Sequence, residues 1–273
     1  MKIITLSTCL SAFLCATALH AVTIDFTAGE SYSDGALDGQ NSWVAQFYGV
    51  ADTAGVGQVN FPLGFNNGNA TYNDANLSGT DLSYTVAGIF SFVADSSNTV
   101  AGFNNTFRLD FREGGIGNGA FDFGTALQLQ RRSGGTWALN RADNGGFASS
   151  STFTDADLGL SLPGDTLSDA LQMTYTITRG AGLTDWGYTG SIFNITTATL
   201  VETYSGTLSV DSAFANAAEL DVAINATTAG SSGELTSIAL TSLELSSVPE
   251  PSQSALFFGL GLAVLCLVRR RRS

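Results

Sequence analysis

Residues 171–178, Leu-Gln-Met-Thr-Tyr-Thr-Ile-Thr, alternate large apolar and polar side chains without a break. Successive side chains of a β-strand point to opposite faces, so this period of two predicts a strand with one buried face and one solvent-facing face. The pattern recurs at 82–92, 107–112, 127–130 and 220–225. By the same rule, solvent-facing positions in two of these stretches are Arg108, Asp110, Arg112, Gln128 and Gln130.

Glycine-rich and asparagine-rich segments at 65–69, 114–119 and 143–146 separate the alternating stretches. Ser133-Gly134-Gly135-Thr136 lies between two of them and is typical of a β-hairpin. Only residues 211–219 have the composition of a short helix. The chain therefore predicts an all-β fold, an antiparallel two-sheet β-sandwich of the jelly-roll type, with less than about a tenth of its residues in helix.

The N-terminal segment 1–21 has the layout of a secretory signal peptide. Lys2 supplies a positive charge, residues 3–15 are mostly apolar, and small residues follow at Ala16-Thr17-Ala18 and Ala21. Cleavage after Ala18 and cleavage after Ala21 both fit this pattern. The segment predicts export, and the domain that remains is 22–247.

The C-terminal segment contains an apolar run, residues 254–268, followed directly by Arg269, Arg270, Arg271 and Arg272. Fifteen residues are short for a membrane-spanning helix, but flanking arginines extend such a helix by reaching the lipid headgroups. The arginine cluster is expected to stay in the cytoplasm. Both terminal segments thus predict that the middle of the chain faces away from the cytoplasm.

A five-residue motif precedes the apolar run and consists of Val248, Pro249, Glu250, Pro251 and Ser252. This motif, the apolar run and the arginine cluster together resemble the PEP-CTERM sorting signal, which would occupy 248–273. The resemblance implies recognition by an exosortase, a membrane enzyme of bacteria that make exopolysaccharide. It further implies an inner-membrane intermediate and then a cell-surface or extracellular protein. The two prolines exclude a helix at the motif and leave an extended peptide.

A second resemblance lies at the front of the domain. Ile24-Asp25-Phe26, followed by residues 32–43, is similar to the opening of concanavalin A-like jelly rolls. In such folds the first strand pairs with the last, so residues 22–27 are expected to pair with residues 238–245.

The apolar positions of that last strand are Ile238, Leu240, Leu243 and Leu245. Leu240 and Leu243 are an odd number of positions apart, so a regular strand would turn Leu243 and Leu245 to solvent. A β-bulge near Thr241-Ser242 absorbs one residue and returns all four side chains to the core.

Residues 22–248 contain no histidine, cysteine or lysine, because His20, Lys2, Cys9, Cys15 and Cys266 all lie outside them. This excludes Ser-His and Cys-His nucleophile pairs and Schiff-base chemistry, and it argues against zinc. The same residues hold six basic side chains, eleven less the five in the terminal segments, and twenty-three acidic ones, twenty-four less Glu250. A net charge of −17 repels nucleic acid.

Carboxylates leave glycoside cleavage as the enzymatic alternative. The nearest match to a Glu-x-Asp-x-x-Glu strand motif is Glu219 to Ile224, and it ends in isoleucine where the acid belongs. We therefore expect no catalytic residue and a noncatalytic protein associated with exopolysaccharide or the cell envelope. A glycan-acting enzyme on the same fold remains the alternative.

Two further possibilities concern ligands. Asp155 and Asp157 with Asp165, and Asn73-Asp74 with Asp81, offer oxygen ligands for calcium, although solvated acidic loops explain them better. No cofactor or other metal is expected. Trp186 and Tyr188 share one strand face and are candidate glycan contacts, with core packing as the alternative.

Overall fold

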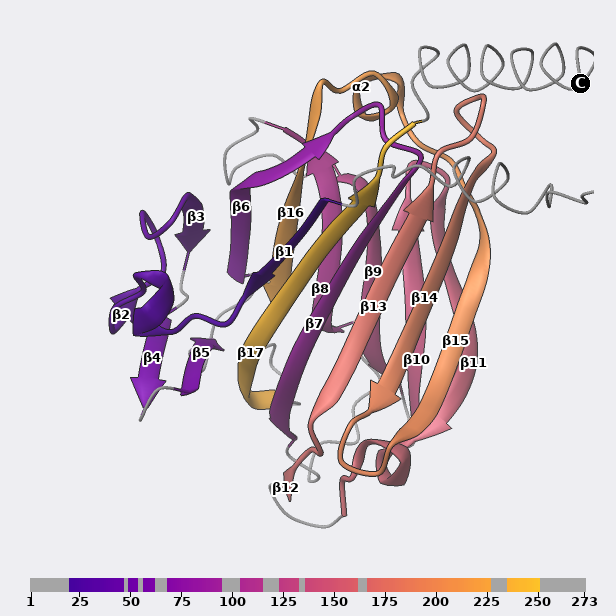
Figure 1. Cartoon of the computed structure of the whole chain (residues 1–273). Coiled ribbons are helices and arrows are strands. Elements are labelled where there is room, and N and C mark those ends of the chain that lie inside the picture. The colour runs from indigo at the N-terminus through magenta and orange to yellow at the C-terminus, as the bar shows by residue number, and fades with distance from the viewer. Residues whose placement is uncertain are drawn as a thin grey trace, which may run out of the picture.

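The structure is a computed structural model that describes residues 20–46, 49–53, 56–61, 68–94, 104–114, 123–132, 136–161, 166–226 and 235–250. These residues form two antiparallel sheets packed face to face (Figure 1). The predicted all-β sandwich is confirmed.

The ten-stranded sheet lies in front in Figure 1. Its strands in spatial order are β15 (Thr199–Leu208), β14 (Trp186–Asn194), β13 (Leu171–Thr178), β7 (Ser83–Ala94), β17 (Leu235–Val248), β5 (Val56–Phe61), β4 (Gly49–Thr53) and β2 (Gly35–Ala36). In addition, β1 (His20–Ile24) pairs with β17, and β12 (Thr166–Leu167) pairs with β7.

The seven-stranded sheet lies behind it. Its strands in spatial order are β11 (Gly146–Thr154), β10 (Thr136–Asp143), β9 (Phe123–Arg132), β8 (Asn104–Glu113), β16 (Glu219–Ala226), β6 (Gly68–Ser78) and β3 (Trp43–Gln46). The β9–β10 hairpin is the one predicted around Ser133–Thr136, with Thr136 opposite Arg132.

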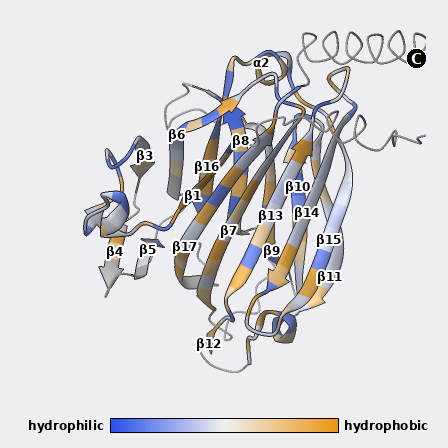
Figure 2. Cartoon of the chain, viewed as in Figure 1, coloured by the Kyte–Doolittle hydropathy of each residue, from blue (hydrophilic) through white to orange (hydrophobic). Residues whose placement is uncertain are grey.

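The core lies between the sheets and is built from the alternating positions. Along β13, the four apolar residues of the 171–178 stretch are buried, and Gln172, Thr174 and Thr176 face outward. Hydrophobic and polar segments alternate along the strands in the same way (Figure 2). Each sheet therefore contributes its apolar face to one shared interior, as the period of two requires.

The closing strand β17 lies inside the ten-stranded sheet, with β7 on one side and β1 and β5 on the other. Leu240 pairs with Phe90 and Ser242 pairs with Ile89, so Thr241 is the extra residue of a bulge. Ile238, Leu240, Leu243 and Leu245 are all buried. The predicted bulge is confirmed.

The predicted pairing of the first and last strands is also confirmed, with Val22 opposite Leu245 and Ile24 opposite Leu243. The ladder stops at Ile24 because the chain turns at Phe26, whose φ of 54° lies in the left-handed region. It begins at His20, opposite Ser247. A signal-peptide cut after Ala18 keeps the His20 pair, whereas a cut after Ala21 removes it.

Helices in the described residues are short. They are η2 (Ala28–Glu30), η3 (Asp155–Leu158) and α2 (Ser212–Ala215). Helix α2 falls in the predicted segment 211–219, and the Asp211 side chain caps it by accepting from the Phe214 N–H at 2.7 Å. Among the residues that the structure describes, no helix is long and apolar enough to cross a membrane. The predicted span 254–268 lies outside them.

Candidate functional site

The outer face of the seven-stranded sheet carries a row of hydrogen-bonding side chains that crosses five neighbouring strands. Strand pairing sets Asn225 of β16 opposite Arg108 of β8, Arg108 opposite Gln128 of β9, and Gln128 opposite Asn140 of β10. Asn140 in turn faces Ser149 of β11. Residues paired across a sheet point to the same face, so these five side chains stand side by side. We call them the polar row.

Ion pairs hold the β8 end of this face in place. The alternate residues of β8 are core phenylalanine and leucine, which turns Arg108, Asp110 and Arg112 outward. The Asp110 carboxylate accepts a hydrogen bond from Arg108 Nε and another from Arg112 Nη2, the second at 2.9 Å. One carboxylate thus orients two guanidinium groups through charge-assisted hydrogen bonds.

Amide and hydroxyl contacts organise the other end. Asn140 donates to Gln130 Oε1, and its own Oδ1 accepts from Ser149 Oγ at 2.5 Å and from Arg132 Nη2 at 3.1 Å. These bonds fix the rotamers of long polar side chains that a lone surface residue would leave free. The row is therefore preorganised.

Gln128, at the centre of the polar row, is only 1% exposed, and its Nε2 has no hydrogen-bond partner among the described residues. A buried amide donor without a partner costs about 1–3 kcal/mol. Such a group needs an acceptor from outside the described residues, which a water molecule or a ligand oxygen can supply.

The expectation that the polar positions of β8 and β9 face solvent is wrong. Arg108, Asp110, Arg112, Gln128 and Gln130 are all at least nine-tenths buried. Alternation identified their face correctly, but it does not report how closely side chains from adjacent strands pack on that face. Pairing between β8, β9 and β10 brings them together. The β9–β10 hairpin was predicted, but the pairing of β8 with β9 was not available from the sequence.

Charge sets this face apart from the rest of the domain. Only six basic residues occur in residues 22–248, and three of them, Arg108, Arg112 and Arg132, are on the outer face of β8 and β9. Two others, Arg131 and Arg141, lie on the inner side of the same sheet, as their pairing with Trp137 and Leu127 shows. A domain with a net charge of −17 thus concentrates its cations in one sheet.

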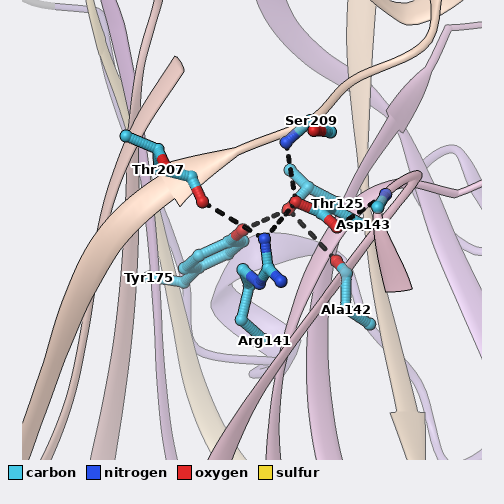
Figure 3. Close-up of polar contacts among 8 residues, drawn as sticks. Thr125, Arg141, Ala142, Asp143, Tyr175, Thr207 and Ser209 are labelled. Carbon is cyan, nitrogen blue, oxygen red and sulfur yellow. Dashed lines mark hydrogen bonds and ion pairs between the residues drawn. The ribbon is translucent and has the colours of Figure 1, made fainter. Parts of the chain in front are cut away.

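A second polar cluster lies between the sheets (Figure 3). Thr125 of β9 shares a hydrogen bond with the Tyr175 hydroxyl of β13, so it joins the two sheets directly. The Asp143 carboxylate binds Arg141 Nη1 at 2.5 Å and accepts from the Ser209 N–H at 2.7 Å. Burial raises the pKa of Tyr175, which keeps its hydroxyl protonated as a donor. This cluster fastens the sheets and offers no open face.

The structure places Trp186 and Tyr188 in the core, which was the alternative for both. They are 1% and 6% exposed. Trp186 packs on Phe214, with ring centroids 5.5 Å apart, and the Arg179 guanidinium lies 5.5 Å from its ring. A ring enclosed in this way has no face left for a sugar.

Gly190, on the same face of β14 as Trp186 and Tyr188, also lies against the core. A Cβ at Gly190 would lie 2.6 Å from a methyl group of Leu127 in the opposite sheet. The missing side chain therefore admits Leu127 and lets the sheets approach, and it does not open a binding surface.

Two of the calcium candidates, Asp155 and Asp157, have protein partners. Asp155 accepts from Trp137 Nε1 at 2.7 Å, and Asp157 accepts from the Thr154 N–H and hydroxyl, each at 2.7 Å. Asp165 lies outside the described residues. Within the described ranges, no group of three or more metal-binding side chains occurs.

Of the sorting residues, Val248 is the last residue of β17, and Pro249 and Glu250 follow it directly, the latter exposed. Pro251, Ser252 and the arginines from Arg269 to Arg272 lie outside the described residues. The motif therefore begins where the sheet ends, with no linker between them.

A family model described as the PEP-CTERM protein-sorting motif matches residues 247–272. This match confirms the sorting resemblance, places the chain in the exosortase pathway, and implies export to the cell surface or the extracellular space. No curated protein matches the chain.

Solved structures share the fold at low identity. The acidic lectin of winged bean, solved with methyl-α-D-galactose, has 10% identity and a TM-score of 0.54, covering 85% of this chain and 100% of the lectin. Lectin II from Ulex europaeus has 14% identity and a TM-score of 0.52, covering 83% and 98%. Arcelin-5, a lectin-like defence protein from Phaseolus vulgaris, has 9% identity and a TM-score of 0.52, covering 86% and 100%. The concanavalin A-like jelly roll is thereby confirmed as the fold.

Proposed function

We propose that the protein is a noncatalytic polysaccharide-binding protein of the bacterial surface or matrix, and that the polar row is its binding site. An inner-membrane intermediate precedes this state. The observation that carries the proposal is the continuous line from Asn225 to Ser149 with the unpartnered amide of Gln128 at its centre.

The chemistry of the row suits sugar hydroxyls. Amide side chains both donate and accept hydrogen bonds, and the guanidinium of Arg108 adds fixed donors in a plane. Neighbouring strands lie about 4.8 Å apart, so five strands extend over roughly 19 Å. A ligand of that length is a chain of several sugar units.

The residues beside the row are small. Ala126 and Ala142 pair across β9 and β10 on one side, and Ala138 faces Gln130 on the other. Small side chains on both sides leave the long polar side chains of the row as the main hydrogen-bonding groups of this face. The lectin bound to methyl-α-D-galactose supports the proposal at the level of the fold alone.

The enzymatic alternative is not supported at Asp110, the buried carboxylate beside the polar row. Both oxygens of Asp110 are engaged by guanidinium donors. Ile224, which occupies the position of the missing acid, is a core residue. Glycoside cleavage needs one carboxylic acid at the glycosidic oxygen and a second carboxylate across the ring, and Asp110 is not available for either role.

The test is binding of the purified exported protein to exopolysaccharide from the producing bacterium, with and without calcium. The variants Gln128→Ala and Asn140→Ala are expected to weaken binding at least tenfold. Gln172→Ala, on the outer face of the ten-stranded sheet, is the matched control and is expected to bind normally. Equal binding by all three would overturn the polar row as the site, and release of reducing sugar ends would overturn the noncatalytic assignment.

A further inference from the structure

The sorting motif leaves the domain at a surface that the fold holds rigid. The carbonyl oxygen of Val248 accepts from the Leu82 N–H at 2.7 Å, and the Leu82 carbonyl oxygen accepts from the Arg179 N–H at 2.8 Å. These bonds connect the end of β17 to the β6–β7 turn, Gly79–Leu82, and to the β13–β14 loop, Arg179–Asp185. We call the turn and the loop together the exit surface.

The end of β17 cannot loosen to lengthen the exposed peptide without breaking two ladders. Leu245 pairs with Val22 of β1 on one side and with Val86 of β7 on the other, and both Leu245 and Ser247 are buried. The Tyr84 hydroxyl donates to the Ser78 carbonyl oxygen at 2.8 Å, which fixes the adjoining turn. A strand that is hydrogen-bonded to a neighbour on each side opens less readily at its end than an edge strand does.

The covalent reach from the sheet to the membrane is short. Five residues, 249–253, separate Val248 from the apolar run. A fully extended chain spans at most about 3.3–3.6 Å per residue, so the run begins no more than roughly 18 Å from the sheet. An enzyme that acts on this peptide must fit between the exit surface and the bilayer.

The exit surface presents two large apolar side chains, Leu82 and Leu183, which are 38% and 42% exposed. The backbone beneath them is ordered: the Leu183 carbonyl oxygen accepts from the Val210 N–H at 2.7 Å, and Arg179 Nη2 donates to the Ala215 carbonyl oxygen at 3.0 Å. Singly exposed apolar side chains are common on protein surfaces, but these two lie on the turn and the loop at which the sorting motif leaves the sheet. They are therefore available to an enzyme that acts on the motif.

We propose that the exit surface is the docking face for the membrane enzyme that processes the sorting motif, so that the enzyme recognises the folded domain as well as the motif. The short reach brings the enzyme next to the folded domain, and Leu82 and Leu183 supply the apolar contact. The inference rests on the sorting motif and is independent of polysaccharide binding.

The test uses the full-length precursor in cells that carry the sorting enzyme. A photo-crosslinking residue at Leu82 or Leu183 is expected to capture the enzyme. The same residue at Leu200, exposed at the β14–β15 end of the sandwich, is expected not to capture it. Crosslinks to lipid alone, or equal capture from Leu200, would overturn the proposal.

Two variants extend the test. The double variant Leu82→Asp with Leu183→Asp should slow maturation severalfold, whereas Leu167→Asp with Leu200→Asp should leave it unchanged. Denaturation midpoints equal to the parent would confirm that each pair leaves the fold intact. A glycine-serine spacer between Val248 and Pro249, about as long as the natural reach, should abolish capture at Leu183. Undiminished maturation of the first double variant would contradict docking, and undiminished capture with the spacer would contradict the argument that the short reach holds the enzyme on this surface.

Discussion

The Thr241 hydroxyl donates a hydrogen bond to the carbonyl oxygen of Ile89, 3.1 Å away, at the point where β17 has one residue more than β7. The side chain of the bulge residue thus occupies an acceptor of the partner strand. Thr241 therefore contributes a hydrogen bond of its own in addition to correcting the register of the strand.

Deleting Thr241 is expected to destabilise the domain strongly, because the register would slip and expose Leu243 and Leu245. Burial of two leucines is worth roughly 3–6 kcal/mol. Thr241→Ala keeps the register and loses only the hydroxyl contact, at about 1 kcal/mol. Denaturant unfolding measures both, with Thr189→Ala on the exposed outer face of β14 as the control. Equal losses for the deletion and for Thr241→Ala would show that the register does not depend on the bulge.

Gly190→Ala should destabilise the domain by about 1–3 kcal/mol, because its Cβ would overlap the buried Leu127 methyl groups. Gly187→Ala on the same strand is the matched control, since its Cβ would meet only Thr178, at an ordinary 3.7 Å. Denaturant unfolding of both variants measures the two losses in the free energy of unfolding, and the loss should be larger for Gly190→Ala. If Gly187→Ala were the more damaging, the close approach of the sheets at Gly190 would be the wrong explanation.

Alkaline pH is expected to unfold the domain through its buried tyrosines. Burial raises the pKa of Tyr72 and that of Tyr84 from 10.0 to about 12. In the unfolded chain these hydroxyls lose their protons near pH 10, whereas in the folded chain they keep them until about pH 12. Stability is therefore unaffected below pH 10 and falls as pH rises from 10 to 12.

Unfolding curves followed across that pH range, together with tyrosinate absorbance, measure this effect. The variant Tyr84→Phe should show a shallower decline, although it starts from lower stability because the hydrogen bond to Ser78 is lost. A decline that begins well below pH 10 would point to other groups.

Changing Glu250 to alanine is expected to block maturation while membrane insertion continues, because the motif would lose its one charged side chain. Precursor should then accumulate in the inner-membrane fraction, as judged by fractionation with a tag on the exported domain. Glu244→Ala, an exposed change on the outer face of β17, should mature normally. Normal processing of the Glu250 variant would remove this carboxylate from the recognition motif.

The sequence was sufficient for the architecture because alternation is a local property. The β13 pattern, the hairpin at Ser133–Thr136 and the register argument at Thr241 each depend on a few adjacent residues and on the known geometry of strands. A fold resemblance predicted that residues 22–27 pair with residues 238–245, and the structure shows this pairing between 22–24 and 243–245. The additional pairing of β17 with β5 at residues 238–240 was not anticipated.

The candidate site was harder to predict because it depends on register between strands distant in sequence. Arg108 and Asn225 are neighbours only because β8 pairs with β16, and nothing local to either stretch indicates that. Trp186 and Tyr188 were candidate glycan contacts but lie in the core, for a related reason. Period-two analysis placed them together on one face of β14, but it cannot tell which face of a sheet is turned to the core when glycines replace the usual large residues.

The central position of β17 also determines how the domain responds to mechanical load. While the chain is held by its tail, drag on the sandwich pulls along β17, parallel to the strand and across its ladders with β7 and β1. Those hydrogen bonds are loaded together in shear, whereas a strand pulled sideways from a sheet edge would lose them one at a time. For as long as the tail holds the chain, we therefore expect the sandwich to resist unfolding by flow better than if the tail were attached to an edge strand.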